Sequence, residues 1–400
     1  MEKSGTQELI LLRNVMQNRA VSAFAQAMCA DDPSAYAVAA EALLEDDMLH
    51  SFAAYLTDKI LHSDNLFARR SFANTLTQDI RTAYAHDLRI LQSLTFRAEN
   101  PPQKITAAVA DGFPAISRGE DGILGKQWDS DETLDKLCEF HKHNGYGIFI
   151  GHKAFTFENG QLKPVYNTSS ITLSDLKDYE AEKKAVVDNT LSFLSGLPYS
   201  NMLLYGDKGT GKSSTIHAVL NQYAEKGLRA VEISKDRLKE ISDVKEVLAE
   251  LPFKFILFID DLSLEERDEK VTSLKASLEG SLSEKGANVM IVATSNRRHI
   301  LKENFSDREN SVHARDTMEE QLSLSDRFGL TVCFSSTGKA EYLSIVRQLA
   351  QDRKLALPDE ELCALAERWA LIKGGRSPRR ARQFIDYAYA CTAKNIPIEF

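Results

Sequence analysis

The sequence of 400 residues lacks any apolar run near the length of about 18 residues that a membrane-spanning helix requires. Its longest apolar run, Phe255–Ile259, has the length of one buried strand. The five cysteines are odd in number and widely spaced, and they form no CxxC pair, which argues against a disulfide framework and a zinc site. The first residues are polar and have no signal-peptide pattern. We therefore expect a cytoplasmic protein without a membrane span.

The remaining composition is that of a globular protein, with 43% hydrophobic and 27% charged residues. At about 150 residues per domain, the length predicts two or three domains. The net charge of −9 repels nucleic acid and anionic membranes at long range. A local basic patch would still bind either of them, so the charge alone does not exclude a small nucleic-acid site.

Residues 1–144 are predicted to form a helical accessory domain, because Ala, Leu and Phe recur there at helical spacing. This stretch contains no motif that indicates chemistry. Residues 145–170 change in character and are predicted to form a β-hairpin linker. Its strand signals are Ile148–Ile150 and Ala154–Phe157, and Asn159–Gly160 is the expected turn.

Residues 171–336 are predicted to form an α/β core, because short apolar runs alternate with helical segments. We expect a parallel sheet with helices on both faces and strands at 202–205, 229–233, 255–259, 289–293 and 330–334. The intervening helices are expected at 176–194, 212–226, 236–251 and 268–284. Residues 337–400 have helical patterns only, at 340–354, 359–372 and 378–394, and are predicted to form a lid.

The strongest motif is the GxxxxGK[ST] pattern that starts at Gly206, with a predicted strand before it and a predicted helix after it. Glycines let backbone N–H groups turn towards phosphate oxygens, and the following helix directs its positive end at the same anion. Lys212 is expected to reach the terminal phosphates and Ser213 to ligate Mg²⁺. The candidate phosphate-binding residues are Gly206, Asp207, Lys208, Gly209, Thr210, Gly211, Lys212, Ser213 and Ser214.

Two further strands are predicted to deliver polar side chains to the same edge of the sheet. Asp260 and Asp261 follow the apolar strand 255–259, and we expect Asp260 to hold Mg²⁺ and Asp261 to orient or deprotonate the attacking water. Asn296 follows the strand 289–293 and is expected to contact the γ-phosphate or that water. Two carboxylates at a strand end are also common as helix caps, so the phosphate loop upstream is what favours the catalytic interpretation.

Two groups of arginines complete the candidate site. Arg327 precedes the last predicted strand, where a guanidinium supplied to a neighbouring subunit would stabilise the transition state. Arg379 lies with Arg380 and Arg382 at the start of a helix that Ser377 and Pro378 are expected to cap. Because cations oppose the helix dipole there, we expect a nearby anion, either a nucleotide phosphate or a nucleic-acid backbone.

The order of these motifs resembles that of the AAA+ ATPase class. More closely, residues from about 145 to 390 resemble a bacterial AAA+-like family known as domain of unknown function 815. The segments that carry the resemblance are Leu203–Ser214, Ala293–His299, Leu322–Gly329, Gly374–Ser377 and Ala381–Phe384. The resemblance implies a P-loop NTPase core of AAA+ type that uses ATP and Mg²⁺, with a C-terminal helical lid and an N-terminal helical domain.

By the same resemblance, Asn296 matches the sensor residue, Arg327 the arginine finger and Arg379 the lid sensor. The residue after the metal-binding acid is usually glutamate in this class, whereas here it is the shorter Asp261. Either hydrolysis is slower, or Glu265 takes this part. The resemblance places adenine contacts in the segment before the phosphate loop, at Leu173, Leu176 and Tyr179.

The function predicted first is an oligomeric ATPase, a ring or an ATP-dependent assembly, that remodels or positions a protein or nucleic-acid partner. The alternative is a slow nucleotide-dependent switch or loader, which would contact DNA through Arg297, Arg298 and the cluster at Arg379. A small-molecule kinase is disfavoured, because the predicted arginine finger and the long lid argue against that function.

Overall fold

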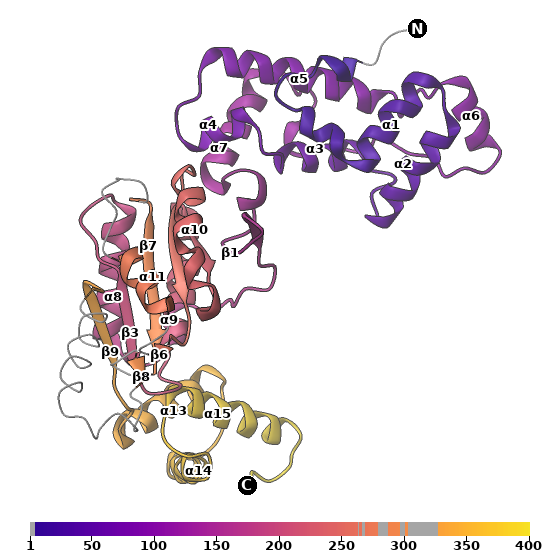
Figure 1. Ribbon diagram of the computed structural model, residues 1–400. Coiled ribbons are helices and arrows are strands. Elements are labelled where there is room, and N and C mark those ends of the chain that lie inside the picture. Colours follow the sequence, from indigo (N-terminus) through magenta and orange to yellow (C-terminus); the bar gives the residue numbers. More distant parts are fainter. Residues whose placement is uncertain (1–4, 263, 266–268, 279–286, 297–300, 303–326) are drawn as a thin grey trace. The chain divides into compact units, whose positions relative to one another are not determined.

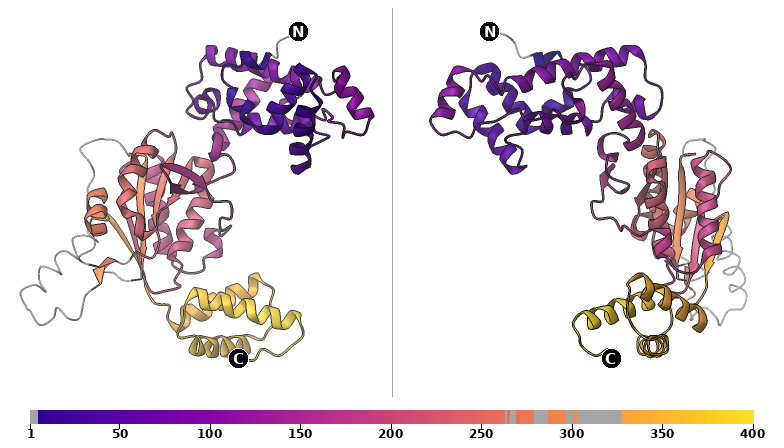
Figure 2. Two further views of the ribbon diagram at one scale, coloured as in Figure 1. Left: turned by 45° about the vertical axis from the view of Figure 1, so that its right-hand side comes forward. Right: turned by 180° about the vertical axis from the view of Figure 1, so that it is seen from behind.

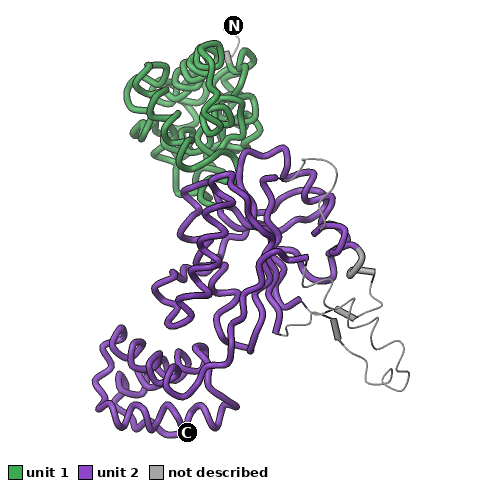
Figure 3. Tube along the Cα trace, turned by 90° about the vertical axis from the view of Figure 1, so that its left-hand side faces the viewer, with its two compact units in different colours: residues 1–152 green, residues 153–400 purple. Residues whose placement is uncertain are grey.

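The computed structural model of the chain describes residues 5–262, 264–265, 269–278, 287–296, 301–302 and 327–400. Within these residues the chain divides into two compact units, residues 1–152 and 153–400 (Figure 3). The division of the chain into four parts at 144, 170 and 336 stays a prediction. No helix of the described residues has the length and apolarity that crossing a membrane would require.

The first unit is helical, as predicted (Figure 1). Its helices are α1 (Arg19–Ala30), α2 (Pro33–Glu45), α3 (Phe52–Leu61), α4 (Leu66–Phe72), α5 (Gln78–Phe96), α6 (Gln103–Ala110) and α7 (Asp131–Asn144). Short 3-10 helices cover Gly5–Glu8, Arg13–Gln17, Gly122–Leu124 and Gly147–Phe149. The predicted strand at Ile148–Ile150 is therefore wrong. The composition of three apolar residues is too little to distinguish a strand from a turn. Gly147, with a φ of 53°, leads the chain into a turn instead.

Helix starts in this unit follow from local side chains. The Asn18 side chain accepts a hydrogen bond from Val21 N at the start of α1, and Asp32 does the same for Ser34 N before α2. Apolar side chains of α1, α3 and the chain before α7 meet in one core, in which Phe24, Phe52 and Trp128 are fully buried. Burial of side chains of this size contributes the main stabilisation of the unit.

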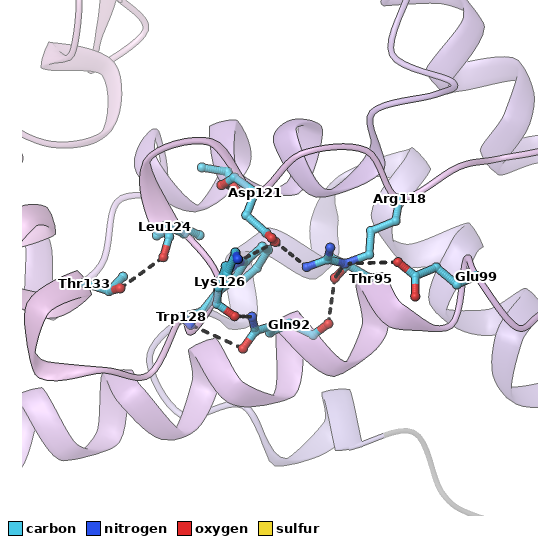
Figure 4. Close-up of polar contacts among 10 residues, drawn as sticks. Gln92, Thr95, Glu99, Arg118, Asp121, Leu124, Lys126, Trp128 and Thr133 are labelled. Carbon is cyan, nitrogen blue, oxygen red and sulfur yellow. Dashed lines mark hydrogen bonds and ion pairs between the residues drawn. The ribbon is translucent and has the colours of Figure 1, made fainter.

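A polar network fixes the long connection between α6 and α7 to helix α5 (Figure 4). The Asp121 carboxylate accepts hydrogen bonds from the Arg118 guanidinium at 2.5 Å and from Trp128 Nε1 at 3.0 Å. Arg118 Nε also donates to Thr95 Oγ1 on α5, at 3.1 Å, and Gln92 Nε2 of the same helix donates to the carbonyl of Lys126. These hydrogen bonds satisfy the polar groups of the network internally. They give the connection a defined path although it has little regular structure.

The second unit contains a seven-stranded sheet, which confirms the predicted α/β fold (Figure 1). The strand order is β2 (Gln161–Pro164), β1 (Ala154–Glu158), β4 (Leu228–Glu232), β5 (Lys254–Ile259), β7 (Val289–Ser295), β3 (Met202–Gly206) and β9 (Leu330–Phe334). All neighbouring pairs are parallel except β1 and β2. A separate pair of short strands consists of β6 (Leu264–Glu265) and β8 (Leu301–Lys302).

The predicted hairpin is present and extends the sheet. Asn159 and Gly160 have φ values of 52° and 79°, which a two-residue turn between antiparallel strands requires. β1 also pairs in parallel with β4, with Phe155 opposite Val231. The hairpin is therefore the edge of the sheet rather than a separate linker element.

Helices cover both faces of the sheet, as Figure 2 shows from two further directions. α8 (Glu180–Leu194) and α9 (Lys212–Tyr223) pack on one face against residues that include Ile256 and Met290. Because side chains alternate along a strand, Phe255 and Leu257 face the other side. α10 (Ile241–Ala249), which contacts α11 (Glu269–Leu278) and β7, lies there.

Several helices differ from their predicted bounds. The helix expected at 212–226 ends as α9 at Tyr223 and is followed by a 3-10 helix at Ala224–Lys226. The helix expected at 176–194 begins only at Glu180, because Asp178 and Tyr179 have left-handed φ values of 71° and 60°. The helix expected at 236–251 is a 3-10 helix at Lys235–Glu240, followed by α10.

The predicted lid consists of α13 (Lys339–Asp352), α14 (Asp359–Ile372) and α15 (Pro378–Ala393), drawn in yellow shades in Figure 2. Tyr342, Phe384 and Ala366 are fully buried in a core that these helices share. Ser377 caps α15 by accepting a hydrogen bond from Arg380 N, with Pro378 in the first turn, as the sequence predicts.

Candidate nucleotide-binding site

The phosphate-loop motif lies between β3 and α9, where the sequence predicts it. Gly206 has a φ of 134°, and a Cβ at this position would lie 1.9 Å from the carbonyl oxygen of Phe334 in β9. Asp207 N donates a hydrogen bond to the same carbonyl at 3.3 Å. The first glycine is therefore required by the close approach of the loop to β9, and it fixes the base of the loop to the sheet.

Lys212 is 6% exposed, and its amine is held by oxygen atoms of the loop and of Asn296, the residue that follows β7. Its Nζ donates hydrogen bonds to the carbonyls of Gly206 (2.9 Å) and Asp207 (2.7 Å) and to Asn296 Oδ1 (3.2 Å). Burial lowers the pKa of this amine, and the charges of Asp207, Asp260 and Asp261 act in the opposite direction. Lys212 and Asn296, which are 84 positions apart in the sequence, are in contact as expected for one site.

The two strand-end carboxylates have different partners. Asp260 Oδ1 accepts hydrogen bonds from the hydroxyls of Ser213 (2.6 Å) and Thr294 (2.5 Å). Asp261 has a φ of 50°, and its Oδ1 accepts from Asn296 Nδ2 at 2.5 Å. The two carboxylates thus have separate hydrogen-bond partners: Asp260 has the two hydroxyls, and Asp261, with its left-handed backbone, has the Asn296 amide.

Thr294 is a site residue for which the sequence gives only a weak signal. Its hydroxyl donates to Asp260 and accepts from Asp261 N at 3.0 Å, so it orients both acids. Threonine near a strand end is common, and the contact depends on the pairing of β5 with β7. Only the tertiary structure identifies this role.

These residues line a cavity of 380 Å³, a size typical of ligand sites. Of the predicted site residues, those that line it are Lys208, Gly209, Thr210, Gly211, Lys212, Ser213, Ser214, Asp260, Asp261, Asn296 and Arg379. Gly206 and Asp207 are not among the lining residues, and their carbonyls accept hydrogen bonds from Lys212 Nζ. Of the expected base contacts, Leu176 and Tyr179 line the cavity, whereas Leu173 lies at a separate groove.

The lid closes one side of the cavity through the start of α15. Arg379 N donates to the carbonyl of Gly209 at 3.2 Å. Gly209 has a φ of 84°, and a Cβ there would lie 3.1 Å from Ser377 Oγ and 3.2 Å from the Arg379 Cβ. The first turn of α15 thus rests on the phosphate loop and brings the Arg379 side chain to the cavity.

Two further cations line the cavity: Arg382, which belongs to the arginine cluster that the sequence predicts near an anion, and Lys183, to which the sequence assigns no role. Arg382 donates to the carbonyl of Asp175 at 2.9 Å. Lys183, which is 7% exposed, donates to the carbonyl of Leu176 at 2.6 Å and to Glu180 Oε1 at 2.6 Å. Arg382 lies one helical turn after Arg379, within the arginine cluster that the sequence indicates. The contact of Lys183 depends on the turn before α8, which the sequence does not indicate.

Several predicted residues cannot be placed in the cavity. Arg327 is half-buried and is not among the cavity-lining residues of the described chain. Arg297 and Arg298 lie outside the described residues, as do Ser325 and Asp326 beside Arg327. Action of Arg327 on a neighbouring subunit, DNA contact at 297–298 and the alternative role of Glu265 stay predictions.

The chemistry of the cavity fits a nucleoside triphosphate with Mg²⁺. Ser213 and Asp260 present a hydroxyl and a carboxylate oxygen to it, and Mg²⁺ prefers such oxygen ligands together with phosphate oxygens. The Lys212 ammonium and the start of α9 supply positive charge on the other side. Leu176 and Tyr179 also line the cavity, together with Ile345 and Leu349 of α13, and their apolar side chains suit a base.

Residues 151–392 match the family described as protein of unknown function (DUF815). The chain belongs to this family. The whole candidate cavity of this DUF815 chain falls within the matched residues.

Solved structures similar to this DUF815 chain include the RuvB Holliday junction branch migration motor of Thermotoga maritima, with 18% identity and a TM-score of 0.40. That similarity covers 56% of this chain and 66% of the RuvB chain. The AAA domain of FIGL-1 in complex with ADP is similar with 20% identity and a TM-score of 0.39, over 57% of this chain and 76% of that one. Neither similarity carries information about the partner of this chain. No curated protein matches it.

Proposed function

We propose that the second unit binds ATP with Mg²⁺ in the cavity and hydrolyses it. The observation that carries the proposal is the convergence of three groups on one cavity. The buried Lys212 ammonium, the Ser213–Asp260 pair and the Asp261–Asn296 pair come from the phosphate loop, β5 and β7. They supply a phosphate-binding cation, oxygen ligands for a metal and groups that orient water.

The side chains have separate roles in this proposal. Lys212 would exchange its bonds to the loop carbonyls for phosphate oxygens, and the loop amides would hold the same anion. Bound Mg²⁺ would supply charge neutralisation at the phosphates, with Ser213 and Asp260 as its protein ligands. Asp261 and Asn296 would position the attacking water, and Arg379 would contact the phosphates from the lid.

We further propose that hydrolysis drives the remodelling or positioning of a macromolecular partner by a homo-oligomer in which Arg327 acts on the nucleotide of the neighbouring copy. The first unit would select the partner. It has its own core and contains 21 of the 58 acidic residues but only 14 of the 49 basic ones, so its net charge of −7 favours a basic protein surface over nucleic acid.

The proposal is tested by Lys212→Ala. We expect nucleotide binding to fall below detection, because the phosphate charge loses its buried cation, and phosphate release to stop. Binding is measured with a fluorescent ATP analogue and turnover by phosphate release. Lys184→Ala is the matched control, since Lys184 is an exposed lysine of α8 that pairs with Asp188 outside the cavity. Unchanged hydrolysis in Lys212→Ala would end the phosphate-loop assignment.

A further inference from the structure

One wall of the cavity has an unusual backbone. The residues Asp175–Tyr179, here called the wall turn, all line the cavity and precede α8. Asp178 and Tyr179 are consecutive non-glycine residues in the left-handed region, with φ values of 71° and 60°. Aspartate tolerates this region, but a bulky side chain such as tyrosine rarely does. Other contacts must therefore hold Tyr179 in place.

Those contacts connect Tyr179 to the segment between the sheet and the lid. Its hydroxyl donates to the carbonyl of Ser335 at 2.7 Å and lies 3.1 Å from Thr337 Oγ1. Ser335 and Thr337 belong to the short connection between β9 and α13, which we call the hinge segment, Ser335–Gly338. Thr337 is 7% exposed, so the Tyr179 hydroxyl satisfies a buried polar group at the hinge.

The same tyrosine is also connected to the phosphate loop. Its ring packs against that of Phe334, with ring centroids 5.3 Å apart. Phe334 is the last residue of β9, and its carbonyl is the atom that Asp207 N contacts and that requires glycine at 206. A short path of direct contacts thus runs from the phosphate loop through Phe334 and Tyr179 to the hinge segment.

An ion pair and a hydrogen bond attach the rest of the wall turn to the lid helices. Lys177 pairs with Asp352 at the end of α13 at 2.8 Å, and Arg382 of α15 donates to the Asp175 carbonyl. Lys183 holds the turn from within α8 through the Leu176 carbonyl. The first of these pairs is partly exposed and contributes little by itself. The buried hydroxyl of Tyr179 is the contact of the turn that reaches the hinge directly.

We propose that Tyr179 is a positioning residue that couples nucleotide occupancy of the cavity to the conformation of the hinge segment, and so to the lid. This inference rests on the proposed nucleotide-binding function. A base against the wall turn holds the left-handed backbone at 178–179 in place. The Tyr179 hydroxyl then keeps the Ser335 carbonyl and Thr337 in their positions, and the lid stays against the phosphate loop. An empty cavity lets the turn relax, and the hinge loses this restraint.

Hydrogen-exchange mass spectrometry on the full chain tests the coupling, with and without adenylyl imidodiphosphate, an ATP analogue that is not hydrolysed. In the wild type, we expect the analogue to slow exchange in peptides that cover the phosphate loop, 206–214, and in peptides that cover 335–345. In Tyr179→Phe, which keeps the ring against Phe334, slowing at 206–214 should persist. Slowing at 335–345 should fall by about fivefold, the effect of losing one hydrogen bond.

Two further variants make the result specific. Thr337→Val removes the partner hydroxyl at the hinge and should also reduce the slowing at 335–345. Tyr199→Phe is the matched control, because the Tyr199 hydroxyl also donates to main-chain carbonyls, of Ala287 and Val289, but away from the cavity. It should respond to the analogue as the wild type does.

The outcomes separate this inference from the function on which it rests. If the phosphate loop responds in Tyr179→Phe and the hinge segment responds as strongly as in the wild type, the coupling role is overturned and nucleotide binding stands. If the analogue slows no exchange at 206–214 in the wild type, the nucleotide-binding proposal fails and the coupling fails with it.

Discussion

Two aspartates, one in each unit, show how the same side chain can have very different surroundings in the two regions. Asp87 on α5 is fully buried, and its carboxylate accepts hydrogen bonds from the backbone N–H groups of Ile10, Leu11 and Leu12. Asp260 at the end of β5 accepts two hydroxyls and borders the open cavity. The first carboxylate is enclosed by fixed donors, whereas the second keeps a side towards a space that can take a ligand.

One arginine from each unit shows the same difference between internal partners and a position at the cavity. Arg118 donates to Asp121 and Thr95 within the network of Figure 4, and its guanidinium lies 4.1 Å from the centroid of the Phe96 ring. Arg379 lines the cavity, and its backbone rather than its side chain makes the hydrogen bond to Gly209. A polar group whose partners are all internal indicates a structural role, and one that faces a cavity indicates a ligand.

The largest expected effect concerns Asp260 and the role proposed for it. Asp260→Asn should lower ATP hydrolysis by about 1,000-fold, or about 4 kcal/mol, because the metal-facing charge is lost. The folded structure should be retained, since asparagine keeps an oxygen that accepts from Ser213 and Thr294. Phosphate release and the melting temperature are measured side by side. Asp188→Asn, an exposed acid of α8, is the control, and equal activity in both variants would contradict the assignment.

A pH effect of about 3 kcal/mol is expected in the first unit. His141 on α7 is fully buried, and burial lowers its pKa from 6.5 to about 4, while Nδ1 contacts the carbonyl of Gly145. The unfolded chain takes up this proton below pH 6.5 and the folded chain only below about 4. Stability from this group is therefore complete above pH 6.5 and is lost as the pH falls towards 4, by about 1.4 kcal/mol per unit.

Urea unfolding at several pH values measures this slope. The change between pH 6.5 and 4 should be smaller in His141→Gln than in the wild type. His143→Gln, which changes an exposed histidine of the same helix, should keep the wild-type slope. A wild-type slope in His141→Gln would show that another group is responsible.

The smallest effect concerns the structural aspartate. Asp87→Asn should lower the stability of the first unit by about 2 kcal/mol, because a charged acceptor of three backbone donors becomes neutral and gains an N–H group against them. ATP turnover per folded molecule should not change. The sequence has two tryptophans, Trp128 and Trp369, so unfolding of the first unit is followed by Trp128 fluorescence in a Trp369→Phe background. A loss of turnover in Asp87→Asn without a loss of stability would contradict the purely structural role of Asp87.

Much of the second unit was predictable because its signals are local. The apolar run before Gly206 and the GxxxxGKS pattern define a strand, a loop and a helix start within a dozen residues. Asn159–Gly160 defined the hairpin in the same way. The short apolar segment at 148–150 failed as a strand signal, because nothing in three residues distinguishes a strand from a turn that glycine opens.

The contacts of the site beyond the phosphate loop depend on distant parts of the chain. Thr294 reaches both acids because β7 pairs with β5, and Arg382 reaches the wall turn because the lid folds back on the core. Tyr179 looked like a helix residue in the sequence, and its left-handed backbone is held by a hinge more than 150 positions later. Such contacts produce no periodicity or fixed spacing that could be recognised in a single sequence.

The sequence by itself determined the phosphate loop, the order of strands and helices along the chain, and the residue types that suit ATP and Mg²⁺. Backbone propensity and short-range spacing act within a few residues, so they can be recognised in the printed chain. Only the tertiary structure decided that Asp260 contacts the hydroxyls of Ser213 and Thr294 and that Arg379 and Arg382 line the cavity. It also decided how Tyr179 is held in the wall turn. These depend on strand pairing and on burial, which bring together residues whose separation in the sequence carries no signal.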